Sequence, residues 1–112
     1  MVDPRRVRQL LDRIAEEERH LRRLARVDEK ELLADHDRMH AIKYGFVIAI
    51  EAAVDVGRHI IASEALEAPE SFAGVFTNLG KAAILTADTT RAMEDAARLR
   101  NLLVHQYADV DD

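Results

Sequence analysis

The sequence predicts an all-α protein, an antiparallel bundle of four helices in which one helix is much longer than the others. Apolar residues recur with the 3.6-residue period of a helix along nearly the whole chain, and no segment alternates as a strand would. The 112 residues include only two prolines and four glycines, so few positions interrupt a helix. This length fits a single helical domain over residues 1–112.

The first helix has a clear start. Asp3 suits the N-cap and Pro4 suits the first helical position, where a missing N–H costs nothing. The apolar stripe continues through Leu21 and Leu24, which predicts a helix that ends near Arg26.

The second helix is expected to begin at Asp28, where Glu31 completes a capping box. No breaker follows until Pro69, so we expect one helix of about 35 residues, roughly 50 Å long, before a loop at 64–70. A ridge of small residues on this helix allows another backbone to approach, either from the same chain or from a second copy. The ridge consists of Ala41, Gly45, Ala49 and Ala52 or Ala53.

Two more helices complete the bundle. Ser71 is a suitable N-cap for a short third helix, and Gly80 is its expected stop. Residues 81–87 form a connector, and the fourth helix is expected to run from Asp88 to about His105.

Composition excludes several classes of protein. A net charge of −5 argues against broad, non-specific binding to duplex nucleic acid, so an RNA substrate requires a local basic pocket. No cysteine is present, which excludes disulfides and thiolate chemistry. We expect a soluble cytoplasmic protein, since no apolar segment resembles a membrane span or a signal peptide. No glycine-rich phosphate loop is visible, and no cofactor is expected.

An arginine lies in the middle of the apolar stripe of the fourth helix. On a helical wheel Arg100 has Met93 and Val104 on one side and Ala96 and Leu103 on the other. An arginine in such a place either pairs with a carboxylate inside the bundle or faces a cleft. Glu51 and Asp55, the only acids in FVIAIEAAVDVGRHII, are its natural partners.

Asn101 and His105 share another face of the same helix, one turn apart, and this face diverges from Arg100. Two arrangements would bring His105 and Arg100 together. The helix ends near Val104 and lets His105 swing round, or two copies of the helix meet and pool their side chains in one groove. The second arrangement requires a homodimer.

These residue types suit chemistry at a phosphate. Arginine makes bidentate bonds to a phosphate and stabilises its growing charge, and histidine moves protons near neutral pH. With an asparagine to orient them, they suit attack by a ribose 2′-hydroxyl on the adjacent phosphate, which needs no metal. His36 and His40 are spaced to face a metal, but no third ligand accompanies them, so no metal site is expected.

The motif also resembles that of a known family. RNLLVHQY, Arg100 to Tyr107, resembles the signature of HEPN domains, and its His-Gln-Tyr ending resembles the HepT-like toxins of that family. AIEAAVDVGRHIIA, residues 49–62, and PESFAGVFTNLGKAAIL, residues 69–85, are also similar to this branch. The resemblance covers roughly residues 28 to 110.

The resemblance implies a bundle of four or five helices that dimerises with its two motifs facing each other. It implies a metal-independent ribonuclease toxin, in which Arg100 binds the scissile phosphate, His105 is the acid–base residue and Asn101 orients. It also implies an antitoxin, a nucleotidyltransferase of the MNT type, which transfers AMP to Tyr107. Two other interpretations remain open: a catalytically inactive HEPN module that binds a nucleotide or a protein, and a helical scaffold in which Arg100 is a buried tie.

Overall fold

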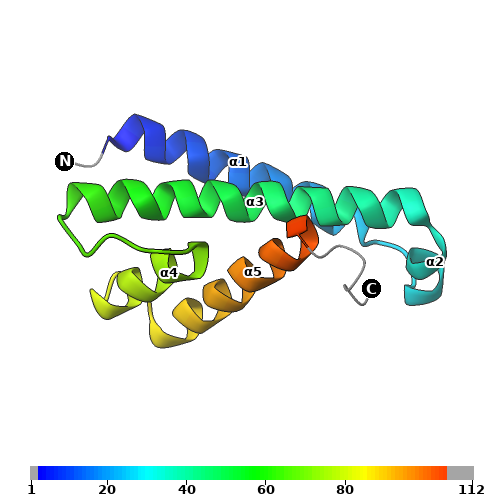
Figure 1. Cartoon of the computed structure of the whole chain (residues 1–112). Coiled ribbons are helices and arrows are strands. Elements are labelled where there is room, and N and C mark those ends of the chain that lie inside the picture. The colour runs from blue at the N-terminus through cyan, green and yellow to red at the C-terminus, as the bar shows by residue number, and fades with distance from the viewer. Residues whose placement is uncertain (1–2, 106–112) are drawn as a thin grey trace.

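The computed structural model describes residues 3–105, and these form five helices without a strand. The helices are α1 (Pro4–Leu24), α2 (Glu29–Ala34), α3 (His36–Ser63), α4 (Phe72–Lys81) and α5 (Ala87–His105). The 28-residue α3 is the axis of the molecule: α1 runs antiparallel along one side of it, while α4 and α5 pack on another (Figure 1). The all-α class and the single dominant helix are therefore confirmed.

The number of helices predicted from sequence periodicity was wrong, because the long helix breaks at Asp35. Asp35 has an extended backbone conformation, and its carboxylate accepts a hydrogen bond from the backbone N–H of Arg38 at 3.0 Å. This hydrogen bond is the main reason that the pKa of Asp35 is lowered. The Arg38 guanidinium also donates to the carbonyl of Leu24, at 2.8 Å, and so joins the start of α3 to the end of α1. An aspartate side chain that competes for backbone N–H groups starts a new helix here.

The N-caps predicted for Asp3, Asp28 and Ser71 are confirmed. The Asp3 carboxylate accepts from the first turn of α1, Asp28 accepts from Glu31 N–H at 2.8 Å, and Ser71 Oγ accepts from Gly74 N–H at 2.9 Å. The first helix ends at Leu24, two residues before the predicted position. These local signals determine where most of the helices begin.

Gly80 does not stop α4, which continues through Lys81. A Cβ on Gly80 would lie 2.5 Å from Thr90 Oγ1, so glycine here allows α5 to approach α4 closely. The left-handed residue that follows is Ala83, with φ of 58°. Gly45 has a similar role: a Cβ there would lie 3.0 Å from Leu21 Cδ2 of α1. The small-residue ridge of α3 is therefore covered at Gly45 by the same chain.

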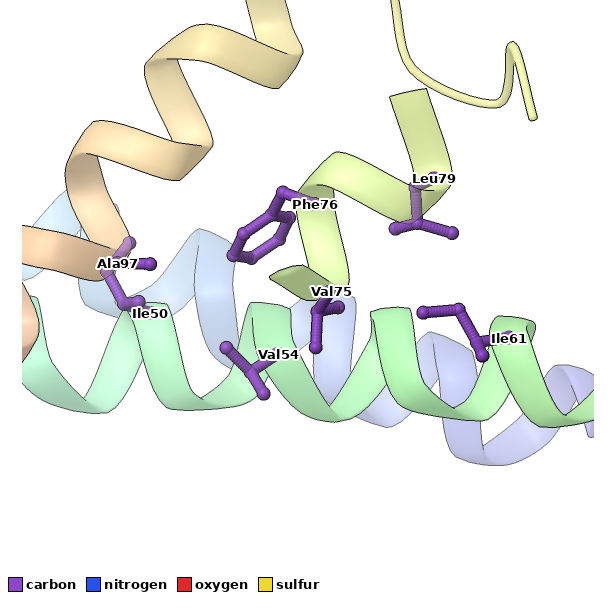
Figure 2. Packing of buried hydrophobic residues seen from close by; sticks show 7 residues of the cluster. All are labelled: Ile50, Val54, Ile61, Val75, Phe76, Leu79 and Ala97. Atoms are coloured by element: carbon purple, nitrogen blue, oxygen red, sulfur yellow. The ribbon is translucent and has the colours of Figure 1, made fainter. Parts of the chain in front are cut away.

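The core lies between α3 and the α4–α5 pair, and Figure 2 shows α4 placing its apolar side chains onto α3. Val54 of α3 and Val75 of α4 are almost completely buried, with 1% and 0% of their surfaces exposed. The other buried members of the cluster are Ile50, Ile61, Phe76, Leu79 and Ala97. This core holds the middle of α5 against α3 and α4 through Met93, Ala96 and Ala97, and the motif follows in the last turns of the helix.

Candidate functional site

Arg100 points inward from α5 to α3 and is largely buried. Its Nη2 donates to Glu51 Oε1 at 2.6 Å, and its side chain is 14% exposed while that of Glu51 is 45% exposed. The guanidinium carbon lies 4.5 Å from the centre of the Phe72 ring. Three helices therefore meet at this guanidinium, because Glu51 comes from α3 and Phe72 begins α4.

The guanidinium is not fully bonded. Nη1 donates to Asn101 Oδ1 at 3.2 Å, and Nε, which is buried, has no hydrogen-bond partner within the described part of the chain. An orphaned buried donor costs about 1–3 kcal/mol, so it is unusual and is often associated with function.

Of the two acids expected to pair with Arg100, only Glu51 does so. Asp55, one turn further along α3, is exposed and forms no ion pair within residues 3–105. Glu51 and Asp55 both line a groove of about 700 Å³ between α1 and α3, together with Arg6, Arg13 and other residues. Arg100 does not line this groove.

Asn101 and His105 lie together on the outer face of α5, as their spacing predicted. They line a shallow hollow of about 440 Å³ with Arg98 and Leu102. His105 is exposed, and so are Leu102 and Leu99, with 39% and 38% of their surfaces accessible. The hollow is thus a partly apolar surface with an imidazole and an amide at its edge.

A single chain does not bring Arg100 and His105 together. α5 stays helical through His105, so the arrangement in which the helix ends near Val104 and releases His105 does not occur. Arg100 points into the bundle, while His105 points to the solvent. Tyr107, the expected site of modification, lies outside the described residues.

Phe72 was not predicted as a site residue, although it lies against the motif arginine. Its ring contacts two guanidinium groups, that of Arg100 and that of Arg58 from α3, whose Cζ lies 5.0 Å from the ring centre. The sequence offered only an aromatic residue after a helix cap. Its distance from Arg100 depends on how α4 and α5 pack against each other.

Residues 3–105 contain no group of three or more histidine, aspartate or glutamate side chains placed to hold a metal ion. The rings of His36 and His40 are 6.0 Å apart, and His40 Nδ1 lies 2.7 Å from the carbonyl oxygen of His36. Within the same residues, every helix is too short or too polar to cross a bilayer.

A curated relative is similar to most of the chain. A tRNA nuclease HepT from Aphanizomenon flos-aquae (strain 2012/KM1/D3) is 28% identical over 94 residues, which are 82% of this chain. The matched segment spans 63% of the length of that relative.

Two solved structures share the fold. A tri-AMPylated HEPN toxin from Shewanella oneidensis, in complex with an MNT antitoxin, superposes with a TM-score of 0.77 at 24% identity and covers 91% of this chain and 78% of that one. A toxin–antitoxin complex with AMP-PNP gives a TM-score of 0.88 at 19% identity, over 95% and 80% of the two chains. A family model described as "Ribonuclease HepT-like" matches residues 14–112. Because this match includes α3, α4 and the motif helix α5, the chain belongs to the HepT-like ribonuclease family.

Proposed function

We propose that this protein is a ribonuclease toxin that cleaves RNA without a metal ion, in a site shared by two copies of the chain. The observation that supports this most directly is the divergence of Arg100 and His105 on an intact α5. The exposed apolar residues beside His105 provide a surface for a second α5, and pairing two copies would place the arginine of each near the histidine of the other. The resemblance of the motif to that of HEPN domains implies the same dimer.

The chemistry follows from the side chains. A neutral His105 ring accepts the proton of a ribose 2′-hydroxyl while its oxygen attacks the adjacent phosphorus, and the bond from phosphorus to the 5′-oxygen breaks. The protonated ring then supplies a proton to the leaving oxygen, and a 2′,3′-cyclic phosphate remains. Arg100 stabilises the added negative charge, Glu51 holds its guanidinium in place, and Asn101 orients the group.

The burial of Arg100 against Glu51 also favours the alternative of a helical scaffold in which Arg100 is a buried tie. A catalytically inactive module that binds a nucleotide or a protein is the other alternative, and cleavage assays distinguish both from a ribonuclease. Because the relative is named a tRNA nuclease, pooled tRNA is the first substrate to test. Arg100→Ala and His105→Ala should each abolish cleavage, whereas His20→Ala, a matched change of an α1 histidine, should not. Wild-type protein that binds tRNA but leaves it intact would support the inactive module.

EDTA tests the metal-free step. Cleavage should continue at the same rate after the protein is treated with excess EDTA and assayed without added metal, because the proton transfers need only His105. A loss of activity that Mg²⁺ or Zn²⁺ restores would show that this part of the proposal is wrong.

We also propose that an MNT-type nucleotidyltransferase is the antitoxin and transfers AMP to Tyr107. The chain has two tyrosines, and Tyr44 is 69% exposed, so it provides a matched control. Incubation with the partner and ATP should add mass in units of AMP to the wild type and to Tyr44→Phe, but not to Tyr107→Phe. A modified Tyr107→Phe protein would place the acceptor elsewhere. Each AMP adds a phosphodiester charge near the motif and should weaken RNA binding, less so at high salt.

A further inference from the structure

An exposed arginine of α3 shares one aromatic ring with Arg100. The Cζ of Arg58 lies 5.0 Å from the centre of the Phe72 ring, and the Cζ of Arg100 lies 4.5 Å from it. The two guanidinium carbons are therefore separated by no more than the sum of these distances. α3, α4 and α5 each contribute one side chain to this stack.

The two arginines differ in their remaining bonds. Arg100 is 14% exposed and is paired with Glu51. Arg58 is exposed and has no hydrogen bond or ion pair within residues 3–105, and its guanidinium packs on the Phe72 ring. A guanidinium has five N–H donors in one plane, and contact with a ring leaves its donor edge free for a planar anion.

Nearby acids do not neutralise Arg58 by contact. Glu51 lies two turns and Asp55 one turn before Arg58 on the same side of α3. Glu51 pairs with Arg100, and Asp55 is exposed without an ion pair in the described part of the chain. Arg58 therefore carries a full positive charge, held by a ring, next to the motif arginine.

We propose that Arg58 is a second phosphate-binding residue, which holds RNA at a phosphate adjacent to the one that Arg100 contacts. The inference rests on the proposed RNA-cleaving function. Phe72 limits the orientations of the Arg58 side chain, so less conformational freedom is lost when the phosphate binds. Arg58 does not touch the reacting atoms and should affect RNA affinity rather than the chemical step.

The test measures binding of a single-stranded RNA with 2′-O-methyl riboses, which cannot be cleaved, at several salt concentrations. Arg58→Gln should bind this RNA roughly three- to tenfold more weakly, as expected for one lost accessible charge-assisted contact. The slope of log affinity against log salt should become shallower by about 0.7, the value for one phosphate contact on a single strand. Cleavage of pooled tRNA should show a raised KM with kcat within about twofold of wild type.

Two further variants provide controls. Arg58→Lys keeps the charge but loses the planar donor edge, so it should lose affinity and keep the wild-type salt slope. Arg91→Gln removes the same charge from an exposed arginine at the start of α5, which pairs with Asp88, and it should match the wild type. Circular dichroism at increasing temperature checks that each variant is folded.

The outcomes separate the two proposals. If wild type cleaves tRNA and Arg58→Gln keeps its affinity and salt slope, the assignment of Arg58 is wrong and the proposed function stands. An equal loss in Arg58→Gln and Arg91→Gln would also overturn the assignment, because it would show a general charge effect. If wild type neither binds nor cleaves RNA, the proposed function fails and the Arg58 inference fails with it.

Discussion

Replacing Glu51 with glutamine should destabilise the protein by leaving the Arg100 guanidinium without its counter-charge. Removing one partner of a fully buried ion pair costs about 3–5 kcal/mol, whereas an exposed pair contributes about 0.2–1 kcal/mol. The pair here is intermediate, because Arg100 is 14% exposed and Glu51 is 45% exposed. Glutamine can still accept a hydrogen bond from Nη2. We therefore expect the free energy of unfolding to fall by about 1–2 kcal/mol.

Urea unfolding followed by circular dichroism measures this loss. With a slope typical of a small domain, the midpoint should fall by roughly 1 M urea. The matched control is Asp55→Asn, which removes the same charge one turn further along α3. The Asp55 side chain is exposed and forms no ion pair within residues 3–105. Its effect should stay within about 0.5 kcal/mol. Each measurement needs several protein concentrations, because a dimer would make stability depend on concentration.

A double-mutant cycle completes the test. In an Arg100→Met background, Glu51→Gln should cost much less than in the wild type, because no buried cation remains to be compensated. Equal costs in the two backgrounds, or equal effects of Glu51→Gln and Asp55→Asn, would refute the argument that Glu51 compensates Arg100.

Three further changes test packing, capping and assembly. Gly57→Ala should destabilise by about 1–3 kcal/mol in a thermal melt, since the new Cβ would lie 2.4 Å from Val75 Cγ1; an unchanged melt would show that the helices can separate there. Ser71→Ala removes the bond from Gly74 N–H and should cost about 1 kcal/mol in urea unfolding, whereas Ser71→Asp should retain most of the stability. In light scattering at micromolar concentration, wild type should give twice the chain mass and Leu102→Glu the mass of one chain; a wild-type monomer would contradict the shared site.

Much of the fold could be predicted from the sequence because its signals are local. An N-cap such as Asp3 or Ser71 acts on backbone groups within three residues, so position along the chain is sufficient to find it. Asp35 is an N-cap of the same kind, since its carboxylate accepts from the backbone N–H three residues later. The apolar periodicity continues across Asp35, however, and therefore predicts one uninterrupted helix. The need of Arg100 for a carboxylate was also predictable, because a cation in an apolar stripe requires one.

Tertiary structure decided what depends on the positions of helices relative to one another. Glu51 and Asp55 are both plausible partners on a helical wheel, and only the crossing of α5 over α3 selects Glu51. The packing of α4 against α3 and α5 brings the Phe72 ring within 5.0 Å of both Arg58 and Arg100, although these three residues are far apart in sequence. Gly80, predicted to end a helix, instead gives room to Thr90, because the approach of α5 to α4 determines what that glycine contacts. Periodicity reports which face of each helix is apolar, but interhelical distance and angle arise from the packing of whole side chains against each other.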